Sequence, residues 1–242
     1  MDWYRHWFET DYYYLLYRNR DQAEASAFIE LITSRISLPP GAHVLDLACG
    51  RGRHSEVLAK LGYCVTGADL SLSSITKAKH KESDNLRFVV HDMREPLDVQ
   101  FRAILNLFTS FGYFEDENDN LRVLKAVYQS LYNGGTFVLD YLNFDYTVQH
   151  LVPAEIRTID GISFNITRKI EGNRVVKTIA VHDRQKKFTK IYTEKVSGFS
   201  LLQFQELFEK AGLKIKDVFG NYQLGPFNSR SSERLILIAE KL

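Results

Sequence analysis

The stretch Val44-Leu-Asp-Leu-Ala-Cys-Gly-Arg-Gly52 decides the fold that this sequence predicts. It joins an apolar strand that contains Asp46 to a turn of small residues, and such a turn lets the backbone approach a ligand closely. A second apolar run ends at Asp69. A glycine-containing first loop with a carboxylate about 20 residues further on is typical of a nucleoside site on a Rossmann-type sheet.

Strands and helices alternate on either side of this stretch. Apolar runs predict strands at 43–48, 63–68, 86–90, 103–107 and 136–141, and helical patterns at 53–61, 72–81 and 118–131 separate them. Such βαβ repetition predicts a largely parallel sheet. After residue 200 the sequence predicts a helix that begins with the capping box Ser200/Gln203 and ends at Gly212, followed by an antiparallel strand pair at 214–219 and 234–240.

Two further segments complete this single domain of residues 1–242. Residues 1–38 predict a helical N-terminal cover that is dense in aromatic side chains and includes a helix at 22–36, which Asp21 and Glu24 cap. Residues 154–197 alternate with a period of two and carry the hairpin signal Asp160-Gly161, which predicts an antiparallel insertion of three or four strands. The insertion is either a lid over the site or a dimerisation element, and the sequence does not decide between them.

The bulk composition excludes several classes of protein. Of the 242 residues, 45% are hydrophobic and 25% charged, and no apolar run is long enough for a membrane helix. The charged N-terminus is no signal peptide, so we expect a cytoplasmic protein with reduced Cys49 and Cys64 and no metal site. A formal net charge of +1 gives no general attraction to nucleic acid. The best local basic cluster, Lys186-Lys187 with Lys190, is interpreted as a solvated hairpin tip.

The first loop argues against a dinucleotide. Ser55 stands where the third glycine of Gly-x-Gly-x-x-Gly would follow Gly50 and Gly52. Asp46 would repel a pyrophosphate at the following helix N-terminus, whereas it suits a cationic ligand. S-adenosylmethionine carries a sulfonium and an ammonium and no phosphate, so it fits this loop.

Three segments together carry a family resemblance: Val44-Leu-Asp-Leu-Ala-Cys-Gly-Arg-Gly-Arg-His54, Val65-Thr-Gly-Ala-Asp-Leu-Ser71 and Ser110-Phe-Gly-Tyr113. With them the chain resembles the class I S-adenosylmethionine-dependent methyltransferases of the bacterial small-molecule type. The resemblance implies a Rossmann-like, seven-stranded, mainly parallel sheet with an antiparallel strand near the C-terminus. It also implies S-adenosylmethionine as cofactor and in-line transfer of its methyl group to a nitrogen, oxygen or carbon nucleophile of a small molecule. Ala48 departs from the glycine that usually opens the family's loop.

The resemblance also implies the site residues. It places Asp69 on the ribose hydroxyls and Asp92 on the adenine amino group. The full set of implied cofactor contacts is Asp46, Ala48, Gly50, Gly52, Arg53, Asp69, Leu70, Asp92, Met93, Asn106 and Phe108. Tyr17, in the aromatic N-terminal segment, is a candidate for contact with the cofactor or the acceptor. Acceptor candidates at or beyond predicted strand ends are Tyr113, Tyr141, Asn143 and Tyr222. No residue can be assigned as a catalytic base.

Three other functions stay open at this level. An RNA methyltransferase would need a coherent basic face, which the net charge does not favour, so we expect no nucleic-acid partner. The segment Asn106-Leu-Phe-Thr-Ser110 lacks the Pro-Pro-aromatic motif that the amino-methylating DNA and protein enzymes carry there. This absence argues against methylation of a DNA base or of a glutamine amide. A nicotinamide-dependent oxidoreductase and a non-catalytic nucleoside-binding protein are the remaining alternatives. A homodimer is possible through the insertion.

Overall fold

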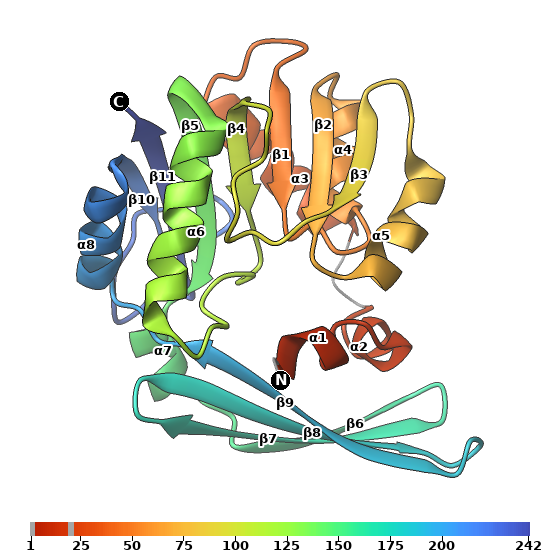
Figure 1. Cartoon of the computed structure of the whole chain (residues 1–242). Helices are drawn as coiled ribbons and strands as arrows, with labels where there is room; N and C mark the ends of the chain where they lie inside the picture. The colour runs from red at the N-terminus through yellow and green to blue at the C-terminus, as the bar shows by residue number, and fades with distance from the viewer. Residues whose placement is uncertain (1–2, 19–21) are drawn as a thin grey trace.

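The computed structural model describes residues 3–18 and 22–242 and contains two β-sheets. Figure 1 shows the larger sheet above and the smaller one below, with two short N-terminal helices between them. The capping residue Asp21, expected at the start of the helix at 22–36, lies outside the described residues. Among the described residues, no helix is both long enough and apolar enough to cross a membrane.

The seven-stranded sheet confirms the predicted fold class. Its strands follow the order β10-β11-β5-β4-β1-β2-β3, and only β11 runs antiparallel to its neighbours on both sides. The bounds are β1 His43–Leu47, β2 Cys64–Asp69, β3 Leu86–Val90, β4 Phe101–Asn106, β5 Leu131–Leu142, β10 Leu213–Phe219 and β11 Arg234–Lys241. The carboxyl ends of the parallel strands therefore meet at one edge, which faces the smaller sheet in Figure 1.

Helices cover both faces of this sheet because alternate strand residues point to opposite sides. Val44 packs with the helices of one face, whereas Leu45 packs with those of the other. The first face carries α3 Gln22–Arg35, α4 Arg53–Lys60 and α5 Leu72–Ala78, which a short 3₁₀ helix at Lys79–Lys81 extends. The second carries α6 Glu117–Ser130 and α8 Leu201–Ala211, and α8 has the predicted capping box of Ser200 and Gln203.

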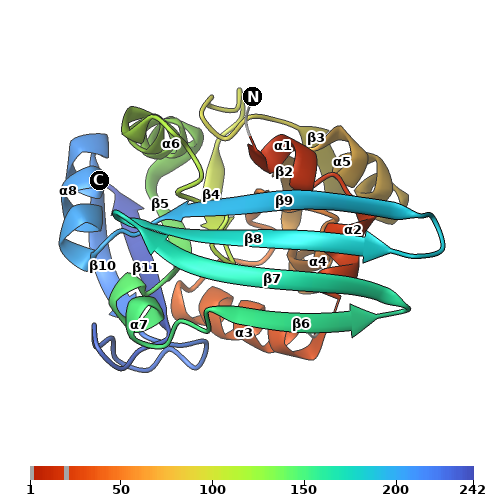
Figure 2. The ribbon, with the colours of Figure 1, turned by 90° about the horizontal axis from the view of Figure 1, so that it is seen from below.

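The insertion forms a four-stranded antiparallel sheet in the order β6-β7-β8-β9. After α7 Phe144–Gln149, its strands are β6 Ala154–Ile159, β7 Ile162–Glu171, β8 Arg174–Asp183 and β9 Phe188–Ser197. The turn at Asp160-Gly161 lies between β6 and β7, as the sequence predicts, and both residues have positive φ. Figure 2 shows this sheet extending across the lower side of the molecule.

The part of the N-terminal cover before residue 18 consists of two short helices, α1 Trp3–Trp7 and α2 Asp11–Leu16, whereas α3, also expected in this cover, packs on the first face of the seven-stranded sheet. The two short helices are separate because Thr10 begins α2 as its N-cap, and its hydroxyl accepts a hydrogen bond from the backbone N–H of Tyr13 at 3.1 Å. Trp7 and Leu16 are buried against the inner face of the insertion sheet. The two helices are thereby fixed between the insertion and the carboxyl ends of the parallel strands.

Candidate cofactor and acceptor site

The loop after β1 makes a tight backbone cradle. Ala48, Gly50 and Gly52 all have positive φ, at 62°, 58° and 77°. Ala48 is strained there because an L side chain disfavours the left-handed region. A Cβ at position 52 would lie 2.4 Å from the Phe88 ring, so only glycine fits at the start of α4.

Asp69, at the end of β2, is oriented by two backbone N–H groups. Its Oδ2 accepts from Gly50 and its Oδ1 from Ser71, each at 2.8 Å. Burial raises the pKa of this carboxyl, although the two hydrogen bonds oppose the rise. The carboxylate links the first loop to the end of β2, and it is positioned to accept hydrogen bonds from a ligand in the cavity.

Asp46 is a second carboxyl beside the same loop, and only 2% of it is exposed. Ser55 donates its hydroxyl to Asp46 Oδ2 at 2.5 Å. Burial, assisted by the charge of Asp69, raises the pKa of Asp46 to about 6. Two neighbouring carboxylates create negative potential, which favours a cationic ligand and disfavours a phosphate. Burial also raises the pKa of the Cys49 thiol in this loop well above its usual range, so the thiol stays protonated.

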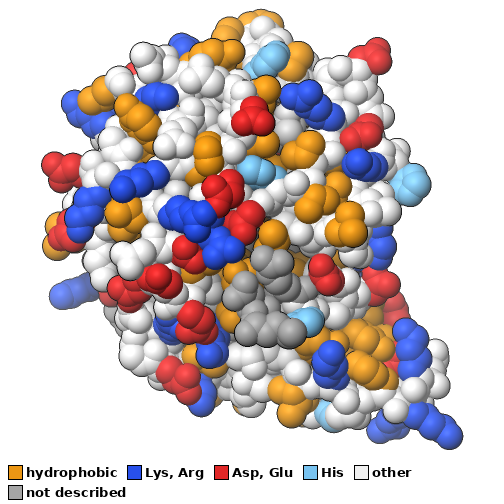
Figure 3. Space-filling view, in the orientation of Figure 1, with side chains coloured by type: hydrophobic (Ala, Val, Ile, Leu, Met, Phe, Trp, Pro, Cys, Tyr) orange, Lys and Arg blue, Asp and Glu red, His pale blue; other side chains and the backbone are white. Residues whose placement is uncertain are grey.

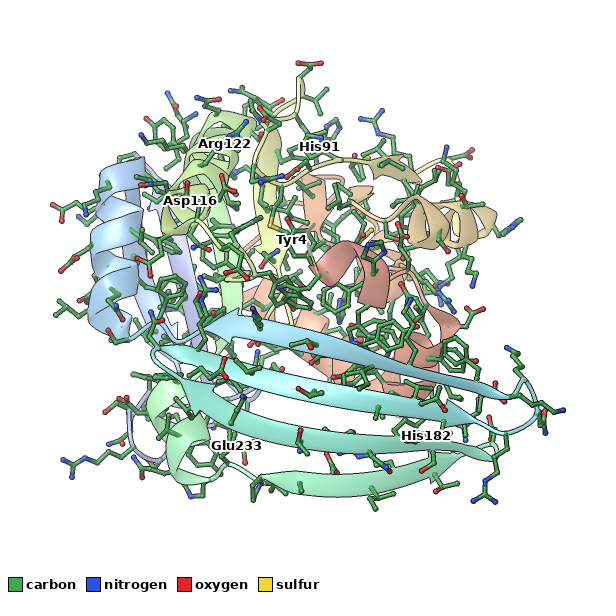
Figure 4. The ribbon with its side chains drawn as sticks, turned by 60° about the horizontal axis from the view of Figure 1, so that its bottom comes forward. Tyr4, His91, Asp116, Arg122, His182 and Glu233 are labelled. Carbon is green, nitrogen blue, oxygen red and sulfur yellow. The ribbon has the colours of Figure 1, made fainter. Side chains whose placement is uncertain are left out.

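A cavity of about 370 Å³ opens between the loop and the N-terminal helices. On one side it is lined by the loop, by Asp69 and by the segment after β3. On the other side lies a group of aromatic side chains that we call the aromatic wall: Trp3, Tyr4, Phe8, Tyr13, Tyr14, Tyr17, Tyr113 and Phe114. Figure 4 labels Tyr4 on α1 and His91 after β3, two of the residues that line this cavity.

The insertion also contributes to the cavity lining, through Glu194 of β9. Glu194 Oε1 accepts hydrogen bonds from Trp7 Nε1 at 2.6 Å and from the Tyr17 hydroxyl at 2.8 Å. Lys177 donates to the Tyr17 hydroxyl and lies 3.5 Å from Glu194 Oε2. This cluster joins α1, α2 and the insertion at the side of the cavity opposite the loop.

The segment after β3 carries an ion-pair network. Arg94 bridges Asp92 and Asp119, each at 2.7 Å, and its guanidinium lies 5.2 Å from the centre of the Phe114 ring. Asp92 and Met93 both line the cavity. The Asp92 carboxylate is oriented by Arg94, whose backbone N–H and guanidinium both donate to it.

The end of β4 contributes an aromatic stack. The Phe108 ring lies parallel to His54, with centroids 4.9 Å apart, and its other stacking partner is Tyr222 at 5.3 Å. Phe108 and His54 line the cavity. Asn106 lies just behind it, where its amide donates to the Leu47 carbonyl at 3.0 Å.

Most of the residues inferred from the sequence meet at this cavity. Those that line it are Asp46, Ala48, Gly50, Arg53, Asp69, Leu70, Asp92, Met93, Phe108, Tyr17 and Tyr113. Gly52 and Asn106 are not part of the lining, but they support the backbone that forms it.

Three acceptor candidates need correction because the structure does not bring them to the cavity lining. Tyr141 is fully buried in the core, where its hydroxyl donates to the Ser197 carbonyl. The Asn143 amide donates to the carbonyls of Ser229 and Ser232, beneath the C-terminal loop. Tyr222 lies behind Phe108. Tyr141 lies within the last residues of β5, and Asn143 and Tyr222 follow β5 and β10, but such a position alone does not fix the direction of a side chain.

Sequence reasoning missed Glu194 and the extent of the aromatic wall. The density of aromatic residues before residue 18 was a usable signal for the wall, although packing alone explains the same pattern. Glu194 gave no signal, because it is 177 residues from its partner Tyr17.

Comparison with known proteins agrees with this geometry. Residues 44–135 match the family model of a methyltransferase domain. The chain is 38% identical over 108 residues to the putative methyltransferase YqeM of Bacillus subtilis (strain 168), a match that spans 43% of this chain and 44% of that protein. The chain thus spans less than half of this relative's length. It is also 28% identical over 226 residues to the dTDP-3-amino-3,4,6-trideoxy-alpha-D-glucopyranose N,N-dimethyltransferase of Streptomyces venezuelae, covering 87% of this chain and 92% of that one.

Solved structures share the fold over nearly the whole chain. An S-adenosylmethionine-dependent methyltransferase from Clostridium acetobutylicum ATCC 824 superposes with a TM-score of 0.80 at 22% identity, covering 95% of each chain. DesVI of Streptomyces venezuelae superposes with a TM-score of 0.71 at 25% identity, covering 96% of this chain and 98% of that one.

The fold and these matches are those of the class I S-adenosylmethionine-dependent methyltransferases, a class whose cofactor is S-adenosylmethionine. Within this chain, residues 44–135 are the part that matches the methyltransferase domain model. The residues present fit the cofactor, since the buried carboxyl of Asp46 and the partly exposed carboxyl of Asp69 both line the cavity, together with the positive-φ backbone of Ala48 and Gly50.

Proposed function

We propose that this enzyme methylates an amine nitrogen of a small molecule. The observation that carries the proposal is the aromatic wall, which faces the same cavity as Asp46 and Asp69. Aromatic faces attract organic cations, by about 0.5–2 kcal/mol for each well-placed ring. The wall therefore suits an acceptor that arrives as an ammonium and reacts as the neutral amine.

The cofactor contacts are part of this proposal. S-adenosylmethionine supplies a methyl group already activated on a sulfonium. Asp69 accepts hydrogen bonds from the ribose, Asp92 and Met93 bind the adenine, and Asp46 lies near the positive charge. The aromatic wall orients the acceptor nitrogen and excludes water, and such positioning can lower the barrier by up to about 7–11 kcal/mol.

The Glu194 cluster forms the polar end of the acceptor site. Because Lys177 lies 3.5 Å from Glu194, the charges of this pair nearly cancel. Cation attraction therefore comes mainly from the rings, while the Tyr17 hydroxyl and Glu194 supply hydrogen-bonding groups.

The names of relatives support a nitrogen acceptor. They include a cypemycin N-terminal methyltransferase of a Streptomyces species, 25% identical over 212 residues that span 82% of this chain and 83% of that protein. An RNA acceptor is less consistent with the surface, since acidic and basic side chains lie side by side on the face in Figure 3.

The insertion is proposed to act as a fixed cover, because Glu194 and Val196 of β9 line the cavity. Its alternative role, as the interface of a homodimer, is proposed from the other side of the sheet, where Ile156 is 74% and Ile191 64% exposed. Sedimentation of the wild type and of an Ile156→Lys/Ile191→Lys variant tests the dimer. A wild type that sediments as a monomer would exclude it.

Transfer of a labelled methyl group from S-adenosylmethionine tests the main proposal. The acceptors are glycine, dTDP-3-amino-3,4,6-trideoxyglucose, benzylamine, phenol and a short RNA, with products identified by mass spectrometry. We expect label on an amine and none on the RNA. Label on phenol or RNA alone would contradict the nitrogen assignment, and tight cofactor binding without any transfer would favour a non-catalytic protein.

A matched pair of variants separates an acceptor role from simple attachment of the cover. Tyr17→Phe and Glu194→Gln remove a tyrosine–carboxylate hydrogen bond at the cavity. Tyr12→Phe and Asp183→Asn remove the bond of 2.9 Å that also joins α2 to the insertion but does not line the cavity. Only the first pair should raise the KM for the amine. Equal effects from both pairs would indicate that Tyr17 and Glu194 only attach α2 to the insertion and do not bind the acceptor.

A further inference from the structure

Asp140, near the end of β5, is a fully buried carboxylate outside the cavity lining. Its Oδ2 accepts hydrogen bonds from the backbone N–H of Phe108 at 2.8 Å and from the Tyr222 hydroxyl at 3.2 Å. Its Oδ1 accepts from Arg234 Nε at 2.8 Å. A buried charge needs such compensation. The three donors come from the segment after β4, the loop after β10 and the start of β11.

The partners of Asp140 include a strained segment. Phe108 and Thr109 have φ of 58° and 59°, so two consecutive residues with side chains lie in the left-handed region. This conformation costs free energy for each L residue and persists only where the surroundings enforce it. Here the Thr109 N–H donates to the main-chain oxygen of Asp140 at 3.0 Å, and Arg234 Nη2 donates to Thr109 Oγ1 at 2.9 Å.

The strained segment directs Phe108 to the cavity. β4 pairs with β1 so that Leu105 lies opposite Asp46, which puts Phe108 at the same sheet edge as the Asp46 carboxyl. The Phe108 ring lies between His54 and Tyr222, and the Arg53 guanidinium is 4.8 Å from its centre. The ring therefore has two stacked aromatic partners and a cation beside it, and a change of its orientation would disrupt these contacts.

We propose that Asp140 is a positioning residue for the methyl-transfer end of the cavity. It keeps Phe108 and Thr109 in the left-handed conformation, so that the stacked rings of Phe108 and His54 form a fixed surface beside Asp46. The inference rests on the proposed cofactor placement, in which Phe108 lies near the methyl group.

Binding of two ligands that differ only at the reacting sulfur tests this role. S-adenosylmethionine carries the methyl group and a positive charge there, whereas S-adenosylhomocysteine has neither. Calorimetry of wild type and Asp140→Asn should show that the variant loses preference for S-adenosylmethionine by about 5-fold to 10-fold, the size of a cation–ring interaction. Asp183→Asn, which alters a buried carboxylate away from the cavity, should leave the ratio of the two affinities unchanged.

The strain supplies a second readout. Thr109→Gly and Thr109→Ala both remove the hydroxyl that Arg234 contacts, but only glycine accepts a positive φ without cost. Asp140→Asn should therefore change the affinity ratio less in the Thr109→Gly background than in the Thr109→Ala background. If Asp140→Asn does not fold, Arg234→Lys removes the contact to Thr109, keeps the charge beside Asp140, and should shift the ratio in the same direction.

The outcomes are distinct. An unchanged affinity ratio in folded Asp140→Asn, or equal effects in the two Thr109 backgrounds, overturns the positioning role while the cofactor site stands. A wild type that binds neither compound overturns the cofactor site itself, and with it this inference.

Discussion

Replacement of Asp46 by Asn should stabilise the fold and weaken cofactor binding at the same time. The Asp46 carboxyl is buried and accepts from the Ser55 hydroxyl, and burial together with the charge of Asp69 raises its pKa from 3.8 to about 6. The folded state therefore favours the protonated form, and ionisation of this group above pH 6 destabilises the fold. Asn is neutral at every pH and keeps an oxygen that can accept from the Ser55 hydroxyl.

The magnitude follows from the difference between the two pKa values. One pKa unit corresponds to 1.36 kcal/mol, so the shift from 3.8 to about 6 corresponds to about 3 kcal/mol. The stabilising contribution of Asp46 is complete below pH 3.8 and is lost as the pH rises through about 6. Relative to wild type, Asp46→Asn should gain about 2.4 kcal/mol of unfolding free energy between pH 4 and pH 7.5, of which about 1.4 kcal/mol lies above pH 5.

Urea denaturation of both proteins, followed by circular dichroism from pH 5 to pH 8, measures this difference directly. At pH 7.5, calorimetry should show weaker binding of S-adenosylmethionine to the variant, because a carboxylate that faces the cationic ligand has been removed. Wild-type affinity should itself fall as the pH is lowered through 6. A stability difference that does not change with pH would refute the assignment of a buried, ionised Asp46.

The remaining predictions concern the same loop. Asp69→Asn should lower the affinity for S-adenosylmethionine by about 100-fold in calorimetry, because the amide cannot replace both acceptor oxygens that Gly50 and Ser71 orient. An affinity within a few-fold of wild type would contradict the ribose assignment. Ala48→Gly should raise the unfolding free energy by about 1 kcal/mol, since it relieves a positive φ of 62°; a lower urea midpoint would contradict the strain. Gly52→Ala should lower that free energy by more than about 2 kcal/mol, because the new Cβ would meet Phe88; wild-type stability would show that the ring can move aside.

Local patterns in the sequence predicted the elements that depend on neighbouring residues. The capping box of Ser200 and Gln203 and the turn at Asp160-Gly161 are such features, because their hydrogen bonds and backbone angles are set within a few residues. The ends of β1 and β2 were predictable for the same reason. Parallel strands bring their carboxyl ends to one edge, so the strand pattern alone was enough to place Asp46 and Asp69 together.

The sequence could not predict in which direction a side chain near a strand end points, and this affected the acceptor candidates Tyr141 and Asn143. Tyr141 belongs to a strand covered on both sides, and the packing of α8 and Phe199 decides that it faces the core. Asn143 turns toward the C-terminal loop because carbonyls there accept from its amide. Neither direction can be read from a strand-end position, since a side chain's face depends on what covers the sheet.

The sequence by itself determined the parallel sheet, the small-residue loop and the pair of carboxylates, because periodicity and turn chemistry act over a few residues. Only the tertiary structure decided that the N-terminal helices and the insertion meet over that loop, and that Tyr17 reaches Glu194 and Phe108 reaches Asp140. These contacts join segments far apart in the chain. They depend on how whole surfaces pack, which no local pattern encodes.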